Sequence, residues 1–261
     1  MKLAASLKFA LLTLAGTLAL VLAGCGFGGK NHSNPTLTTG NWSIKATSTN
    51  TANAFTVGGN LTQSGTSLSG KMYIVGADPG CNIDPAQAVT ITGTVSGSNI
   101  ALSSASVAGQ VITIAASGTG SAFSGTYFIA GGNCGGDQGN VAANAVASVA
   151  GTWSGTVQVS SAPVTMSVVL TQASTVSADG TFALSGTITY VGSVCDANAT
   201  VLATSRIAGA NVTVDASVGD GTFNFTGPVD SVTAPKNIVG TYSTSDSCAG
   251  DPDQIVTLTK Q

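Results

Sequence analysis

The chain contains an internal repeat, and this repeat limits its possible folds more than any other feature. Five short motifs recur in the same order at offsets of 109 to 116 residues. The recurring pairs are Gly40–Ser43 with Gly151–Ser154, Leu61–Gln63 with Leu170–Gln172, Leu68–Gly70 with Leu184–Gly186, Gly125–Tyr127 with Gly240–Tyr242, and Cys134–Asp137 with Cys248–Asp251. A period of about 110 residues exceeds that of solenoid repeats, so each copy should be a domain with its own core. We predict two domains of one fold, residues 40–149 and 150–261.

Within each copy, apolar and polar residues alternate with a period of two. Val89 and Ile91 are separated by Thr90, and Phe223 and Phe225 by Asn224. This pattern, interrupted by Gly, Ser, Asn and Asp, is typical of short strands with one buried face. In the first copy it predicts strands near 40–47, 55–63, 67–75, 88–96, 99–104, 110–116, 121–130 and 139–147. We therefore expect an all-β chain of two antiparallel meander barrels, each with about eight strands.

Glycines inside these strands fit a small barrel, because they allow tight bending. They occupy apolar-face positions at Gly70, Gly93, Gly125, Gly186 and Gly240.

Gly40-x-Trp42 and Gly151-x-Trp153 open the first strand of each copy. This motif resembles that of lipocalin- and avidin-like barrels, which implies that each Trp packs across the closed end of its barrel. Lys260 is the cation available to Trp153, whereas no cation on the last strand of the first copy suits Trp42. An immunoglobulin-like sandwich is the alternative, but its Trp lies between the two bridged cysteines. Here each Trp precedes both cysteines of its copy, which favours the barrel.

The first 24 residues have the organisation of a secretory signal peptide. Lys2 and Lys8 precede an apolar run over residues 9–23, and small residues close that run. The run is shorter than the roughly 20 residues that a spanning helix needs, which disfavours an uncleaved anchor. An ordinary signal peptide with a cut after small residues is the other alternative.

The order Leu22-Ala23-Gly24-Cys25 resembles the lipobox of bacterial lipoproteins. The resemblance implies cleavage before Cys25, a diacylglycerol on its thiol, and a fatty acyl chain such as palmitate on the new amino group. Several acyl chains hold a protein on a bilayer, whereas one chain binds only marginally. We therefore expect a lipid-anchored protein of the bacterial envelope, in the outer membrane, facing either the periplasm or the cell surface.

The mature chain is acidic and carries few charges. Residues 25–39 combine Gly, Asn and Pro without periodicity and are predicted to be a flexible tether. Loss of the signal peptide leaves six Lys and Arg against 11 Asp, with no Glu, so the mature net charge is about −5. So few cations cannot neutralise a row of phosphates, which argues against a nucleic-acid partner.

Four cysteines remain besides Cys25, and they can pair in three ways. Cys81 and Cys134 are 53 residues apart, and Cys195 and Cys248 have the same separation. An exported chain permits disulfides, so we expect one bridge per copy, between the loops after the third and seventh strands. Both loops emerge at the same end of a meander barrel, and such a bridge would cover its mouth. A zinc site is disfavoured, because two cysteines with no histidine nearby cannot complete the ligand set.

Catalysis is not expected from this sequence. The only histidine, His32, lies in the predicted tether, so neither domain has a histidine base for a nucleophile. Aspartates gather on the cysteine-bearing loops, at Asp78, Asp84 and Asp137 in the first copy and at Asp196, Asp246, Asp251 and Asp253 in the second. Glycoside hydrolysis needs a pair of carboxylates, but only Asp137 and Asp251 correspond between the copies. The spacing of Asp246, Asp251 and Asp253 matches no EF-hand loop, and no metal or cofactor is expected.

Two classes of function remain. The first is a structural or interaction protein of the envelope, whose surface or loops meet an envelope protein or glycan. The second is a binding module that takes a small ligand or glycan in the barrel mouth or interior. A bridge across the mouth would obstruct entry, which favours the first class. Asp137, Asp246, Asp251 and Asp253 are then the candidate surface or ligand residues.

Overall fold

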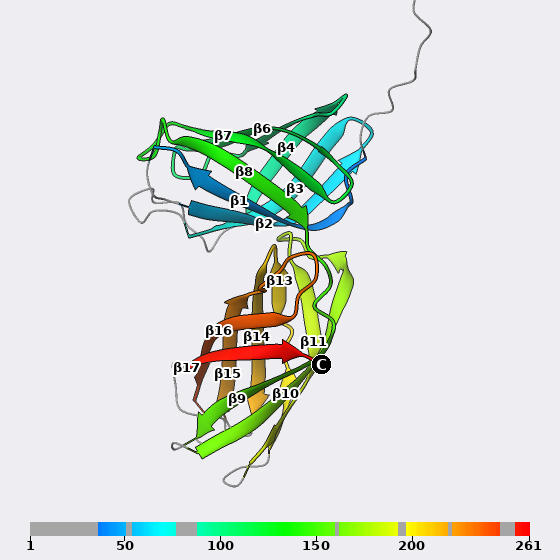
Figure 1. Cartoon of the computed structure of the whole chain (residues 1–261), viewed down its shortest axis with the longest axis vertical. Coiled ribbons are helices and arrows are strands. Elements are labelled where there is room, and N and C mark those ends of the chain that lie inside the picture. Colours follow the sequence, from blue (N-terminus) through cyan, green and yellow to red (C-terminus); the bar gives the residue numbers. More distant parts are fainter. Residues whose placement is uncertain are drawn as a thin grey trace, which may run out of the picture. The chain divides into compact units, whose positions relative to one another are not determined.

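The computed structural model describes residues 36–50, 54–76, 88–159, 162–192, 197–218, 221–245 and 254–261. All regular structure in these residues is β-strand (Figure 1). Barrel 1 contains β1 (Gly40–Ser48), β2 (Ala54–Ser64), β3 (Ser67–Val75), β4 (Val89–Ser96), β5 (Asn99–Ser104), β6 (Val111–Thr119), β7 (Ala122–Ala130) and β8 (Gln138–Ala145). Barrel 2 contains β9 (Gly151–Val159), β10 (Ala162–Val176), β11 (Phe182–Val191), β12 (Ala197–Val201), β13 (Arg206–Ala208), β14 (Asn211–Val218), β15 (Gly221–Pro228), β16 (Asn237–Thr244) and β17 (Gln254–Lys260).

Barrel 1 is a closed antiparallel meander. Each strand pairs with the next along the chain, and β8 returns to pair with β1 from Trp42 opposite Ala145 to Ser48 opposite Gly139. The predicted strand positions are confirmed to within three residues at each end. The closed circuit also rules out the immunoglobulin-like sandwich, whose two sheets do not join around a circle.

Barrel 2 follows the same closed circuit with one interruption. β9 pairs with both β10 and β17, and β10 also pairs with β11, which closes the sheet. The strand equivalent to β4 is broken into β12 and β13, both of which pair with β11 and β14. At the break, the Ser205 hydroxyl bonds the backbone N–H and C=O of Asp215 at 2.9 and 3.0 Å. The Ser205 side chain takes the place of a backbone hydrogen bond that is missing at the break. Because one strand is divided into β12 and β13, barrel 2 contains nine strands where barrel 1 contains eight.

Each barrel has its own apolar core, and the two tryptophans occupy equivalent places in it. Trp42 and Trp153 are both fully buried. The Trp42 indole donates to the Thr38 carbonyl at 2.7 Å, and that of Trp153 donates to the Val149 carbonyl at 2.8 Å. Lys260 lies over the Trp153 ring at 5.3 Å, as the sequence suggested.

The segment before β1 belongs to the body of barrel 1. Leu37 is buried in its core, and the Leu37 N–H donates to the Gln63 side chain at 2.8 Å. Thr36 and Thr38 exchange backbone hydrogen bonds with Gly120. The predicted tether, residues 25–39, therefore does not extend as a free segment to Thr39; its residues before Thr36 lie outside the described part of the chain.

Hydrogen bonds also join the two barrels. The Asn41 side chain, which is buried, accepts from the Gly209 N–H at 2.7 Å and donates to the Gly209 carbonyl at 2.9 Å. The Tyr73 hydroxyl donates to the Asp179 carboxylate at 2.9 Å. Asn41 stands where the second copy has Thr152, so this contact uses one of the positions at which the copies differ.

Candidate functional site

Two rows of outward-facing side chains cross five neighbouring strands of barrel 1. Strand register places directly opposed residues side by side across β4, β5, β6, β7 and β8. The first row is Thr92, Ser103, Thr113, Phe128 and Gln138, and the second is Thr94, Ala101, Ala115, Thr126 and Asn140. Because side chains alternate between the faces of a strand, both rows lie outside the barrel.

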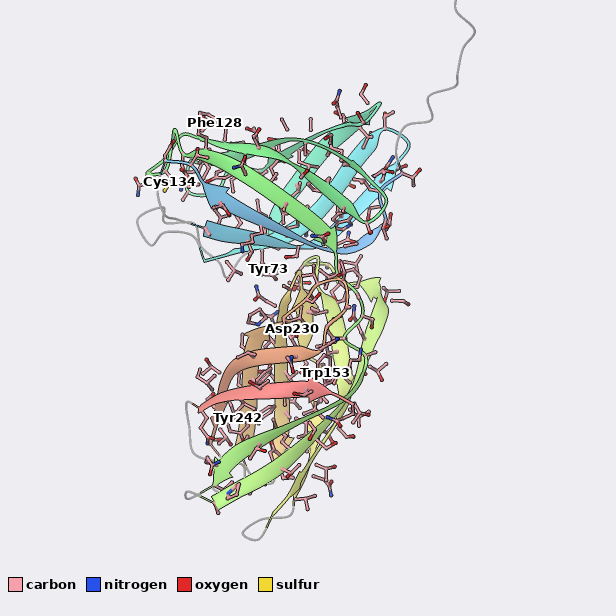
Figure 2. All side chains as sticks on the ribbon, viewed as in Figure 1. Tyr73, Phe128, Cys134, Trp153, Asp230 and Tyr242 are labelled. Atoms are coloured by element: carbon pink, nitrogen blue, oxygen red, sulfur yellow. The ribbon has the colours of Figure 1, made fainter. Side chains whose placement is uncertain are left out.

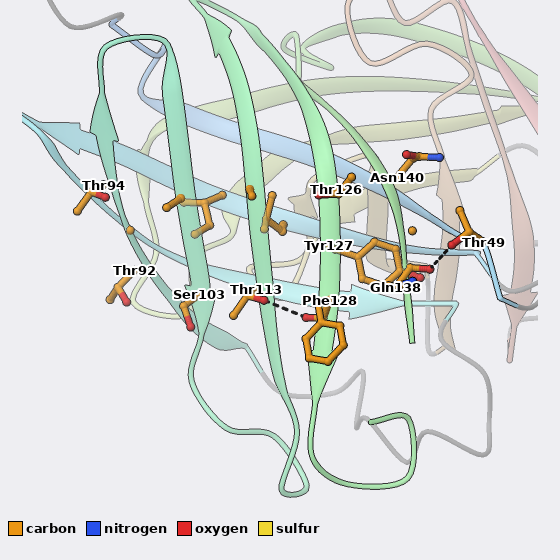
Figure 3. Close-up of a pocket in the computed structure, with 16 residues that line it drawn as sticks. Thr49, Thr92, Thr94, Ser103, Thr113, Thr126, Tyr127, Phe128, Gln138 and Asn140 are labelled. Carbon is orange, nitrogen blue, oxygen red and sulfur yellow. Dashed lines mark hydrogen bonds between the residues drawn. The ribbon is translucent and has the colours of Figure 1, made fainter. Parts of the chain in front are cut away.

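The two rows line a groove with a volume of about 760 Å³ (Figure 3). A second hollow of about 470 Å³ shares Thr94, Ala101 and Ala115 with it and continues it toward the β4–β5 turn. We call these two hollows together the outer groove. The volume of each hollow lies within the range of ligand sites in other proteins, about 300–1,000 Å³.

Two inward-facing glycines explain why the barrel wall is hollowed here. A Cβ atom on Gly93 would lie 2.1 Å from the Ala101 carbonyl oxygen, and one on Gly125 would lie 2.1 Å from that of Ala115. Only glycine permits neighbouring strands to approach so closely. Small residues thus form this part of the wall, and the methyl groups of Ala101 and Ala115 leave the middle of the second row low.

Phe128 is the one aromatic residue with an exposed side chain in the described part of the chain. Its side chain is 44% exposed and projects from the outer surface of barrel 1 (Figure 2). Its neighbours in β7, Tyr127 and Ile129, point into the core and are buried. Contact between an apolar ring and water is unfavourable. The Phe128 ring lies in a groove, where a bound ligand would shield it from water.

The rest of the outer groove is polar but uncharged. Its lining contains no acidic, basic or histidine side chain among the described residues. Thr92, Thr94, Thr126 and Asn140 make no side-chain hydrogen bond within the described part of the protein. Each of these groups can both donate and accept a hydrogen bond, so they are free to meet a ligand.

The interior of barrel 1 offers no comparable space at the cavity found there. That cavity measures about 10 Å³ and is lined mainly by apolar side chains such as Ile44, Ile74 and Ile112. Even one water molecule needs about 10–15 Å³. Space for a ligand therefore lies on the outer face of barrel 1 and not in this interior cavity.

Asp137, a candidate surface or ligand residue, is engaged within its own barrel. Its carboxylate accepts from the Ser48 hydroxyl at 2.5 Å and from the Tyr127 hydroxyl at 2.8 Å. Burial of Tyr127 and its hydrogen bond to the Asp137 carboxylate raise the pKa of the phenol to about 12. Both carboxylate oxygens thus tie β1 and β7 to the turn before β8.

The other predicted site residues lie outside the described residues. These are Cys25, Cys81, Cys195, Cys248, Asp246, Asp251 and Asp253. Cys134 is placed between β7 and β8, as predicted, and is disulfide-bonded. No other cysteine is described, so the pairing itself stays a prediction.

The described residues contain no cluster of three or more His, Cys, Asp or Glu side chains arranged to hold a metal ion. No helix among them is long and apolar enough to cross a bilayer.

The second copy lacks the chemistry of the outer groove. The shared Gly-Thr-Tyr motif and the strand register place Ser243 where barrel 1 has Phe128. They likewise place Asn224 at the position of Thr113 and Asp215 at that of Ser103. Asn224 and Asp215 bind each other at 2.6 Å, so these polar groups are already paired.

Sequence reasoning missed the outer groove. The signal was present in Phe128, an aromatic residue at a polar-face position of β7, and in the aligned Thr residues beside it. Their alignment depends on the register of five strands, which alternation within each strand does not specify.

Comparison of the chain with protein-family models, curated proteins and solved structures finds no match.

Proposed function

We propose that this protein is a non-catalytic interaction module of the bacterial cell envelope, anchored through lipid on Cys25, that binds another envelope component in the outer groove of barrel 1. The observation that carries the proposal is Phe128, an exposed aromatic ring within a hollow of about 760 Å³. Concave sites with an aromatic contact and a few polar groups are the usual form of a binding site. The outer groove contains no carboxylate, histidine or cysteine among its lining residues, so its Ser and Thr hydroxyls have no such group beside them to activate them as nucleophiles.

The first part of the proposal is the lipid anchor on Cys25. Acyl chains on Cys25 would hold the mature chain on a membrane, each buried CH₂ contributing about 0.8 kcal/mol. In the native host, Cys25→Ser should abolish lipid attachment and move the protein out of the membrane fraction. An unmodified Cys25 thiol in the intact mass of the mature wild-type protein would overturn the anchor.

The binding role is tested by replacing Phe128 with the residue of the second copy. Detergent-solubilised full protein is mixed with detergent-washed envelope material of its host, and the material is pelleted. We expect Phe128→Ser to reduce co-sedimentation affinity at least about tenfold, because loss of a central aromatic contact commonly costs more than ~1.4 kcal/mol.

Val169→Ser is the matched control, since Val169 is also 44% exposed but lies on β10 of barrel 2. It should leave co-sedimentation unchanged. If Phe128→Ser pelleted as well as the wild type, the outer groove would not be the binding surface.

A further inference from the structure

We infer that the component bound in the outer groove is an uncharged polysaccharide chain, with a sugar ring lying on Phe128. This inference rests on the proposed function and names the chemical class of its ligand. Four properties of the groove support it: its polar groups, its lack of charge, its shape and the closed sheet beneath it.

The polar groups of the groove match those of a sugar chain. Hydroxyls and amides line it at Thr92, Thr94, Ser103, Thr113, Thr126, Gln138 and Asn140. Each both donates and accepts hydrogen bonds, as does every sugar hydroxyl. The C–H groups on one face of a pyranose ring are apolar and can cover the exposed Phe128 ring, which packs its own apolar face against them.

Charge excludes the anionic polymers of an envelope. No cationic side chain lines the groove to pair with carboxylate, sulfate or phosphate groups. In the described part of barrel 1 the charged side chains are Lys45, Lys71 and Asp137. Lys71 donates to the Ala178 carbonyl, and Asp137 is bound by Ser48 and Tyr127. The mature chain is acidic, which also disfavours an anionic ligand.

The groove has the length and openness of a site for a chain. It crosses five strands, and four strand spacings of about 4.8 Å make roughly 19 Å. The adjoining hollow of about 470 Å³ extends it beyond the two rows. Several sugar units of an extended polymer can therefore lie across the rows, whereas an isolated monosaccharide would contact only a small part of them.

The closed sheet disfavours an extended peptide as the ligand. A peptide commonly binds a sheet by adding a strand to a free edge. β4 to β8 are each paired on both sides in barrel 1, so none of them has a free edge. A helical peptide would need several apolar contacts, and Phe128 is the single large exposed apolar side chain in the groove.

The class of ligand is tested with the co-sedimentation assay after chemical treatment of the envelope material. Periodate cleaves the vicinal diols of sugars and should abolish binding of the wild-type protein. Protease treatment and high salt should leave that binding unchanged, because a neutral glycan is neither a protein nor held by ion pairs.

A direct measurement uses the neutral polysaccharide fraction of the envelope, separated from the anionic fraction by anion exchange. We expect calorimetric binding to the neutral fraction alone, weakened at least about tenfold by Phe128→Ser. Phe128→Trp should retain binding and give a blue shift of Trp fluorescence when the ring is covered, since Trp42 and Trp153 are already buried.

The outcomes separate the two proposals. If binding requires Phe128 but is lost to protease and survives periodate, the ligand is a protein and the glycan inference is wrong, while the proposed function stands. If binding does not require Phe128, both are wrong. Binding to the anionic fraction that disappears at high salt would also overturn the inference.

Discussion

Tyr127 and Phe128 are adjacent in β7, and the barrel wall gives them opposite roles. Tyr127 points inward, is buried, and donates its hydroxyl to Asp137 at 2.8 Å. Phe128 points outward and stays 44% exposed. Alternation within the strand predicts the first role but makes Phe128 an exception, since an aromatic stands at a polar position. Such a local conflict is expected where function rather than folding selects a residue.

The pKa of Tyr127 makes stability depend on alkaline pH. Burial and the Asp137 hydrogen bond raise this pKa from 10.0 to about 12. A group with a raised folded-state pKa contributes stability below its unfolded pKa and loses it as the pH rises through the folded value. The free energy of unfolding should therefore fall between about pH 10 and pH 12, by an amount on the order of 2 kcal/mol. Denaturant unfolding at a series of alkaline pH values checks this, and Tyr127→Phe should remove that part of the dependence.

Asp137→Asn is the companion variant. It removes the negative charge beside the phenol, so the pKa of Tyr127 should decrease while burial still holds it above its ordinary value. Tyrosinate absorbance during alkaline titration, with Tyr127→Phe subtracted, measures the change. Identical titration curves for wild type and Asp137→Asn would show that the carboxylate does not act on Tyr127.

At the scale of single strands, sequence periodicity was a reliable guide. The alternating runs predicted β1 to β8, because most of these strands, β3 to β8, have one buried and one solvated face. The break between β12 and β13 was not predictable, since it depends on Ser205 bonding the backbone of Asp215 across strands. The outer groove was missed for a similar reason: it arises from the relative register of five strands and from the close approach that Gly93 and Gly125 permit.

Gly125 provides a test of how the groove is formed. A Cβ atom there would lie 2.1 Å from the Ala115 carbonyl oxygen, so Gly125→Ala must push β6 away from β7. We expect a loss of about 1–3 kcal/mol in the free energy of unfolding, as for other overpacked sites. Affinity for envelope material should fall as well.

Ser124→Ala, on the exposed face one residue earlier, is the control and should stay within about 0.5 kcal/mol of the wild type. Equal stability of Gly125→Ala and Ser124→Ala would contradict the close approach of β6 and β7.

A second prediction at this scale concerns the disulfide pairing of the cysteines in the loops after the third and seventh strands. Cys134 is disulfide-bonded, and we predict Cys81 as its partner, with Cys195 bonded to Cys248. Closing a loop of 53 residues contributes about 4 kcal/mol on the chain-entropy model. Peptide mapping of the unreduced mature protein identifies the pairs, and reduction should lower the melting temperature. A peptide joining Cys134 to Cys195 or Cys248 would show that the bridges run between the copies instead.

At the scale of the whole molecule, duplication produced two barrels that then diverged on their surfaces. The buried positions remain alike, as Trp42 and Trp153 show by their equivalent hydrogen bonds. The exposed positions differ, so Phe128 is replaced by Ser243 and the groove chemistry occurs in barrel 1. The repeat in the sequence predicted the shared fold, because core residues are constrained alike in both copies. It could not predict which copy carries a site, since that depends on the residues that differ.

Asn41 is one position at which the two copies differ and at which a side chain joins the barrels. Its buried amide makes two hydrogen bonds to Gly209, at 2.7 and 2.9 Å, across 168 positions of the chain. Asn41→Ala would leave the Gly209 N–H and C=O without these partners, at a cost of about 1–3 kcal/mol for each buried group. We expect a clear decrease in the free energy of unfolding, measured by denaturant titration with Trp fluorescence.

Asn60→Ala is the matched control for Asn41→Ala. The Asn60 side chain bonds only Thr62 of its own strand, at 3.3 Å, among the hydrogen bonds of the described residues. This variant should therefore change stability by no more than about 0.5 kcal/mol. Asn41→Thr, which introduces the residue of the second copy, should lose most of the stability that Asn41→Ala loses, because a threonine cannot present an amide to both Gly209 groups. If Asn41→Ala unfolded at the same denaturant concentration as Asn60→Ala, the pair of bonds to Gly209 would not stabilise the molecule.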